Sequence, residues 1–529
     1  MSFFMVQCGP DKEEDRSKVF YYNESNAITS LDPAFARDLE TMWATNQLFD
    51  GLLELDSLLR PQPCIAKQWS VSDDGLRYSF VLRNDVRFHS SPLFQNPDDR
   101  KVTAHDFVYS FNRILNPTVA SPGAWIFEHL AEDGVLAIND SILELRLRQP
   151  FQPFLGLLTT QYANVVPREV VEHYGADFRE HPIGTGPFQF GFWYEQIALV
   201  FHRHPNFWKC DEAGNKLPYL DAVKIDFVKD MTVEYQGLLS GRYDFMSGIH
   251  AAFKDELLTP NGDLDPAFEE QIRFQKTPFI KTDYLGFLLN STRVEAKEQA
   301  ILNPVVRQAI EMAIDKVAMV KYLRNNTVMP ANDGFVPPVL LGQTQSGAST
   351  YNPEKARQLL QSNGLSKDQL HISMYATGDY ADLLEYIQHA LAEVGITAQV
   401  VVLQSANFKE QTSKAQLPVF RKSWLADYPD AENFLAIFRS NRFAPGGPNY
   451  MHYSSEAFDA LYLRAIAETN DSLRLNMYRE MNEILQRDIP VIPLYYDQVS
   501  HFVGRNVRGF RTNAINMIDL STVQKVVVQ

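Results

Sequence analysis

One stretch decides how the rest of the chain is interpreted: Val419-Phe420-Arg421-Lys422-Ser423-Trp424-Leu425-Ala426-Asp427-Tyr428-Pro429-Asp430-Ala431-Glu432-Asn433-Phe434-Leu435. Its first half predicts a strand, which Pro429 ends because proline lacks an amide donor. If the strand is regular, residues 421, 423, 425 and 427 share one face, so both charges could line a cleft. The alternative is that Arg421 and Asp427 are solvated surface charges flanking a core Trp424.

The length and composition predict a folded protein with more than one domain. The chain has 529 residues, and a single core stops growing at about 250 to 300 residues. Hydrophobic residues make up 45% and charged residues 22%, which are ordinary values for globular proteins. The formal net charge of −16 argues against a general affinity for nucleic acid or for anionic membranes.

The three cysteines, Cys8, Cys64 and Cys210, form no Cys-x-x-Cys motif. They suggest neither a zinc site nor a disulfide framework, although one pair could be bonded. No run of about 18 apolar residues is present. Residues 3–6 are apolar and precede Cys8 and the charged run 11–16, which resembles the end of an export signal, a lipid-modifiable cysteine and a tether. The alternative is a disordered tail with an incidental cysteine.

Hydrophobic periodicity predicts a mixed α/β fold. Thr103 and Asp106 have capping-box spacing at the start of one helix, and Asn303 with Pro304 marks the start of another, expected to extend to residue 323. The predicted strands lie at 19–22, 66–72, 77–82, 143–147, 223–228, 243–247, 284–290, 371–375, 397–403 and 490–496, and the remaining predicted helices at 38–53, 232–240, 353–364, 381–393 and 472–487.

No catalytic motif is found. The chain has no Gly-x-Ser-x-Gly, no His-Glu-x-x-His, no EF-hand loop and no nucleotide-binding glycine motif. His202 and His204 are the histidines nearest to ligand spacing, and a solvated strand is their expected setting. Carboxylates are plentiful, so hydrolysis by paired carboxylates is permitted by the sequence but has no support in it.

Several blocks in this order resemble one family. They lie at 31–33, 46–52, 69–82, 86–89, 103–114, 182–188, 303–323 and 424–434. Together they are similar to the large extracytoplasmic solute-binding proteins of peptide-type ABC importers, the oligopeptide- and dipeptide-binding proteins of solute-binding protein family 5. The resemblance runs from about residue 19 to about residue 510.

The resemblance implies a two-lobe α/β fold of the periplasmic-binding-protein type, with a ligand cleft between the lobes and an extra insertion domain in the first lobe. The expected division is a signal remnant or tether at 1–18, lobe I at 19–46, 182–277 and 490–529, the insertion domain at 47–181, and lobe II at 278–489.

The resemblance also assigns candidate ligand contacts. Asp427 matches the aspartate that holds a peptide's free α-ammonium, and Trp424 matches an aromatic residue near the peptide backbone. Arg421 matches an arginine that in oligopeptide binders can meet the C-terminal carboxylate. Ser423, which lies between the two charges on the expected face, completes the ligand-binding set. The residues after Asp427 are closer to the dipeptide type, whereas Arg421 favours the oligopeptide type, so the length of the ligand stays open.

The implied function is to capture short peptides and deliver them to the permease subunits of an ABC importer. The protein would be a monomer in the periplasm or on the outer face of the cell membrane, with Cys8 as a lipid-anchor site. It would need no cofactor, no metal and no nucleic acid, and it would not be an enzyme. The alternatives are a binder of a non-peptide solute (a nickel complex, sugar or opine) in the same family and, more remotely, an extracellular hydrolase.

Overall fold

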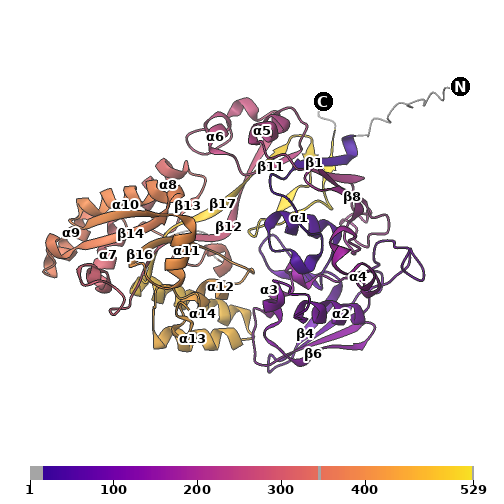
Figure 1. The fold of residues 1–529 in the computed structure, drawn as a ribbon, viewed down its shortest axis with the longest axis horizontal. Helices are drawn as coiled ribbons and strands as arrows, with labels where there is room; N and C mark the ends of the chain where they lie inside the picture. The colour runs from indigo at the N-terminus through magenta and orange to yellow at the C-terminus, as the bar shows by residue number, and fades with distance from the viewer. Residues whose placement is uncertain (1–15, 343–346, 527–529) are drawn as a thin grey trace, which may run out of the picture.

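The computed structural model describes residues 16–342 and 347–526, so Cys8 lies outside the described residues. Its main feature is an 11-stranded mixed sheet with the order β15-β14-β16-β12-β17-β11-β1-β10-β9-β8, in which β13 also pairs with β17. The sheet extends through both halves of the molecule, which Figure 1 shows side by side. We refer to the half with β1 as the first lobe and to the half with β14 as the second lobe.

Two long strands, β12 (Ile272–Phe287) and β17 (Val491–Gly504), connect the lobes in the middle of Figure 1. They pair antiparallel over most of their length, but the register shifts between Pro278 and Thr282. On one side of this shift β17 pairs with β11 of the first lobe, and on the other side β12 pairs with β16 of the second lobe. The irregular segment therefore lies at the crossing point between the lobes.

The first lobe contains the predicted N-terminal strand, which is confirmed as β1. Its β1 pairs parallel with β10 and β11, and Phe20 and Tyr22 are buried in the core. The predicted helix 38–53 ends earlier, at Leu48, because Phe49 is already extended. The elements are β1 (Val19–Asn23), α1 (Leu39–Leu48), β8 (Phe188–Tyr194), β9 (Ala198–Arg203), β10 (Ala222–Asp226), α5 (Met231–Leu239), β11 (Phe245–Ser247), α6 (Ala251–Leu257), β18 (Val507–Arg508), β19 (Arg511–Thr512), β20 (Ile518–Asp519) and β21 (Gln524–Lys525).

A smaller four-stranded sheet, in the order β4-β5-β7-β6, lies next to the first lobe. The predicted hairpin is confirmed as β4 and β5, and the capping box of Thr103 and Asp106 begins α2 as expected. The elements are β2 (Leu53–Leu55), β3 (Pro61–Pro63), β4 (Ala66–Val71), β5 (Arg77–Leu82), α2 (Ala104–Leu115), β6 (Leu130–Asn139), β7 (Ile142–Leu147), α3 (Phe154–Leu157) and α4 (Arg168–Tyr174).

The second lobe carries helices on both sides of β14, β15 and β16. The helix predicted from 303 to 323 is two helices, because Ile314 leaves helical geometry and Asp315 caps a new start. The elements are α7 (Pro304–Ala313), α8 (Lys316–Arg324), β13 (Met329–Pro330), α9 (Pro353–Ser362), β14 (His371–Thr377), α10 (Ala381–Glu393), β15 (Thr397–Leu403), α11 (Ser405–Ser413), β16 (Val419–Leu425), α12 (Ala431–Leu435), α13 (Glu456–Ala467) and α14 (Asp471–Asp488).

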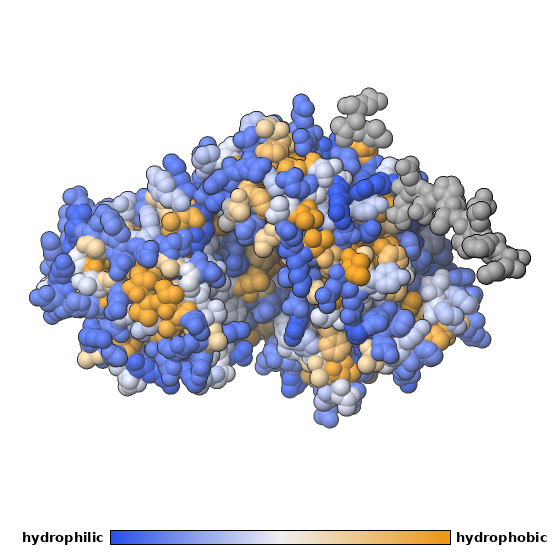
Figure 2. Space-filling model, turned by 45° about the horizontal axis from the view of Figure 1, so that its top comes forward, coloured by the Kyte–Doolittle hydropathy of each residue, from blue (hydrophilic) through white to orange (hydrophobic). Residues whose placement is uncertain are grey.

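The lobes approach each other beside β12 and β17 and again at a distance from these strands. Trp125 next to the small sheet lies with its ring centroid 5.9 Å from that of Tyr428 in the second lobe. The backbone amide of Gln152 donates to the backbone carbonyl of Ile466 at 3.0 Å. Figure 2 shows a hollow between the two lobes with hydrophobic side chains in its depth. No helix in the described ranges is long and apolar enough to cross a membrane.

Candidate functional site

One edge of β16 has no strand partner near the hollow. Along its full length, from Val419 to Leu425, β16 pairs with β12. On its other side it pairs with β14 only at Val419 and Phe420, and β14 ends at Thr377. Within the described residues, the backbone edge from 421 to 425 is therefore open. Unpaired amide and carbonyl groups on such an edge can accept an added strand.

Asp427 lies just beyond the end of this edge. It is exposed, and its backbone amide is 3.4 Å from Oδ1 of Asn433. Partial burial raises the pKa of Asp427 above its usual value, opposed by a hydrogen bond from the Asn433 side chain. No Lys or Arg in the described part of the chain forms an ion pair with it. The negative charge of Asp427 is thus uncompensated by any ion pair with the described residues.

Asp427 also lies close to the first lobe. Tyr162 lies between α3 and α4. Its pKa is raised to about 12, chiefly by burial and further by the charges of Asp38 and Asp427. The neighbouring Tyr428 has its ring centroid 5.9 Å from that of Trp125, beside the small sheet, so the end of β16 lies close to the other lobe.

Trp424 and Asp427 meet at Asn433. The indole Nε1 of Trp424 donates to Oδ1 of Asn433 at 2.9 Å. Asn433 is buried on α12, which Asp430 caps by accepting from the amide of Glu432 at 2.9 Å. The strand ends at Leu425, so Asp427 does not continue the alternation of Arg421 and Ser423. The expectation that a regular strand would place residues 421 and 427 on one face is corrected here.

Arg421 is buried on the other face of β16, so it is not a solvated surface charge. Its guanidinium forms an ion pair with Asp283, which is 0% exposed. The guanidinium carbon lies 3.0 Å from the ring centroid of Tyr380. Burial lowers the pKa of Arg421 to about 10, and the charges of Tyr495 and Asp497 oppose this shift. Ser423 lies directly opposite Asp283 in the strand register and is half-buried.

Sequence reasoning missed two residues next to this set. Lys422 is half-buried, and its Nζ lies 4.8 Å from the ring centroid of Tyr450. In the described ranges no carboxylate pairs with it. Asn433, which holds Trp424 and Asp427, was the second. The sequence held a signal for both. Lys422 has the same strand parity as Trp424, so the two side chains share a face. Asn433 lies on the helix that begins just after Asp427, so its side chain can turn back toward Asp427.

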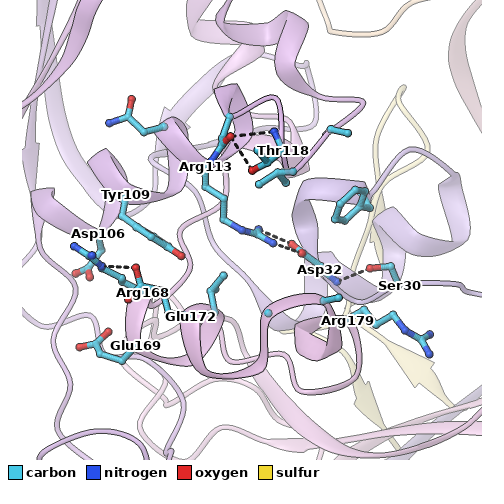
Figure 3. Close-up of a pocket in the computed structure, with 18 of the residues that line it drawn as sticks. Ser30, Asp32, Asp106, Tyr109, Arg113, Thr118, Arg168, Glu169, Glu172 and Arg179 are labelled. Carbon is cyan, nitrogen blue, oxygen red and sulfur yellow. Dashed lines mark hydrogen bonds and ion pairs between the residues drawn. The ribbon is translucent and has the colours of Figure 1, made fainter.

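A pocket beside α2 and α4, shown in Figure 3, lies elsewhere. It encloses about 1510 Å³ and contains none of the predicted ligand contacts. Arg113 crosses it to Asp32 at 2.9 Å, and Arg100 meets Asp106 at 2.6 Å. Asp32 also accepts from the amide of Ala34 at 3.0 Å. The Leu-Asp-Pro block of the sequence therefore fixes a loop to α2.

The two histidines noted in the sequence differ in setting. His202 is exposed, as expected, but His204 is buried, which corrects the expectation of a solvated strand. His204 Nδ1 and His89 Nε2 each lie 3.1 Å from the carbonyl oxygen of Gly186. Burial lowers the pKa of His204 to about 4. Within the described residues, no three His, Cys, Asp or Glu side chains are grouped to hold a metal ion.

Comparisons with known proteins agree on one family and one fold. A family model described as "Bacterial extracellular solute-binding proteins, family 5 Middle" matches residues 60–445. The dipeptide-binding protein DppE of Bacillus subtilis is 25% identical over 98% of this chain and 95% of its own length. The structure of HbpA2 from Haemophilus parasuis matches with a TM-score of 0.84 at 23% identity, covering 96% of this chain and 100% of that chain.

A third match is the binding protein DppA from Helicobacter pylori, solved in complex with the peptide STSA. It has a TM-score of 0.71 at 23% identity and covers 96% of this chain and 98% of that chain. The structural matches and the single large sheet confirm the predicted two-lobe α/β fold.

Proposed function

Since the chain belongs to the bacterial extracellular solute-binding proteins of family 5, we propose that it binds short peptides between its lobes and delivers them to the permease of an ABC importer. The observation that carries this proposal is the uncompensated carboxylate of Asp427 at the end of the open edge of β16. An extended peptide can pair its backbone with that edge and place its α-ammonium on Asp427.

Electrostatics support the assignment of Asp427. An ammonium that leaves water needs a carboxylate partner, and an unpaired buried charge costs about 2–5 kcal/mol. Asp427 has no such partner in the described chain, and partial burial already disfavours its ionised form. A peptide ammonium would compensate the charge of Asp427 and stabilise the ionised carboxylate.

The other candidate contacts have different roles in this proposal. Trp424, oriented by Asn433, lines the wall beside the ligand backbone. Ser423 lies on the open edge. Arg421 can meet a ligand carboxylate only if its ion pair with Asp283 opens, which would leave that fully buried carboxylate with only Lys281, 3.9 Å away, as a cation among the described residues.

The lobes would close on the ligand by a hinge motion, and the permease would recognise the closed form. The irregular register of β12 and β17 between Pro278 and Thr282 is the proposed hinge. We propose lobe I at 19–46, 182–277 and 490–529, an insertion domain at 47–181, and lobe II at 278–489. The protein would act as a monomer outside the cytoplasm, with a tether at 1–18 and Cys8 as its lipid-anchor site.

The proposed role is binding without turnover. Native mass spectrometry of protein purified from its own cells tests it, because a bound ligand is weighed directly. Masses of short peptides, returned unchanged after incubation with the pure protein, are the expected result. A nickel complex, a sugar or an opine would favour a non-peptide solute, and peptide fragments that accumulate with time would favour a hydrolase.

A further inference from the structure

Lys422 is a half-buried cation without an acidic partner in the described chain, whereas Lys281, Arg324 and Arg421 each have one. Lys281 pairs with Asp497 at 2.7 Å and Arg324 with Asp382 at 3.0 Å. Arg421 pairs with Asp283. Among the described residues, the contact of the Lys422 ammonium is with the ring of Tyr450, at 4.8 Å from Nζ to the centroid.

The surroundings of Lys422 are those of an uncompensated positive charge. Burial lowers the pKa of Lys422, and the nearby charges of Lys409 and Arg421 lower it further. Asp427 is in the opposite situation, because burial raises its pKa and so disfavours its negative charge. An anionic group placed near Lys422 would relieve an electrostatic cost that the protein does not relieve itself.

Lys422 and Asp427 lie toward opposite ends of the open edge. Lys422 has the same strand parity as Trp424, whose indole bonds to Asn433, and Asn433 also contacts Asp427. The three side chains therefore belong to the side of β16 that faces α12. From residue 422 to the end of the strand at Leu425 is about 10 Å at roughly 3.3 Å per residue, and the turn to Asp427 adds to it.

That separation matches the two ends of a short extended peptide. Three or four residues span about 10–13 Å at the same rise. A ligand that pairs antiparallel with the open edge, with its ammonium at Asp427, brings its C-terminal carboxylate toward Lys422. The long flexible stem of lysine lets the ammonium adjust to ligands of slightly different length.

We propose that Lys422 binds the C-terminal carboxylate of the peptide, so that the site selects zwitterionic peptides of three or four residues. This inference rests on the proposed peptide-binding function. Lys422 fits the role better than Arg421, since recruiting Arg421 would break a buried ion pair with Asp283 whereas recruiting Lys422 breaks none.

The test uses the full-length protein and three tripeptide pools of the same composition: free at both ends, amidated at the C-terminus, or acetylated at the N-terminus. Calorimetry compares the wild type with Lys422→Met, the charge-preserving Lys422→Arg, and Lys409→Met as a control that removes a neighbouring exposed cation. The wild type should bind the free pool at least about tenfold more tightly than the amidated pool. Lys422→Met should reduce this ratio to within about twofold, and the other two variants should keep it.

Equal affinity of the wild type for free and amidated peptides would overturn the proposal, as would an unchanged ratio in a folded Lys422→Met protein. If the Lys422→Met protein fails to fold, the proposal is tested by the other two proteins. The wild type and Lys422→Arg must then both bind free peptides at least about tenfold more tightly than amidated ones. Failure of the proposed function looks different, because then none of the three pools binds.

Discussion

The indole Nε1 of Trp424 donates to Oδ1 of Asn433 at 2.9 Å, and the same amide side chain contacts Asp427. Asn433 therefore orients two proposed ligand contacts from a buried position on α12. Both contacts depend on one amide group, whose oxygen accepts while its nitrogen donates to the carboxylate.

Replacing Asn433 by leucine should weaken peptide binding by about tenfold, the worth of roughly one hydrogen bond to a charged group. Without the amide, Asp427 loses a donor and its pKa should rise further. Calorimetry gives the affinity, and a carbon-13 NMR titration of Asp427 gives its pKa. Asn476→Leu on the exposed face of α14 is the matched control. An unchanged affinity and an unchanged Asp427 pKa in Asn433→Leu would contradict this role.

The ion pair of Arg421 and Asp283 should contribute to folding. Asp283 is 0% exposed, and Arg421 is 7% exposed. Removing one partner leaves the other charge buried, so Asp283→Ala should lower the free energy of unfolding by about 3–5 kcal/mol. Urea unfolding measures it, and replacing both residues with leucine and methionine should recover most of the loss. A loss below about 1 kcal/mol in the single variant would mean that the pair is not buried in solution.

Glu432 should make stability fall as the pH rises. Its carboxyl accepts from the hydroxyls of Tyr428 and Tyr462, and burial raises its pKa from 4.5 to about 7. The unfolded chain ionises near the lower value, so the fold loses stability between pH 4.5 and about 7, by about 3 kcal/mol in total. Urea unfolding at pH 5 and pH 8 measures the slope.

Glu432→Gln should flatten that slope, because glutamine does not ionise. Glu483→Gln, at an exposed position of α14, should leave it as in the wild type. Equal slopes in the wild type and in Glu432→Gln would show that another group is responsible.

Much of the fold could be predicted from local signals. The hairpin around Gly75, the capping box at Thr103 and the Asn303 cap are set by residues a few positions apart, and each is confirmed. The break at Ile314 was missed because the apolar face runs on through it. Asp315, a residue type that favours the N-cap, was the local signal of a new helix start.

The site was harder to predict than the fold. The strand at 419–425 is confirmed, but alternation does not tell which face is covered, so burial of Arg421 was unforeseen. Its partner Asp283 lies 138 positions earlier in the chain. Such pairing depends on strand register between distant segments, which periodicity does not encode. Lys422, by contrast, could have been placed on the face of Trp424 from its strand parity alone.

The most direct test of the central claim compares one tripeptide pool with its N-acetylated form in the wild type and in Asp427→Asn. Acetylation removes the ammonium and leaves the rest of each peptide intact. Calorimetry should show that acetylation weakens binding to the wild type by at least about thirtyfold, and that this ratio falls to within about threefold in Asp427→Asn. Equal affinities of the wild type for the free and acetylated pools, or the same ratio in both proteins, would contradict the assignment of Asp427 as the residue that holds the peptide ammonium.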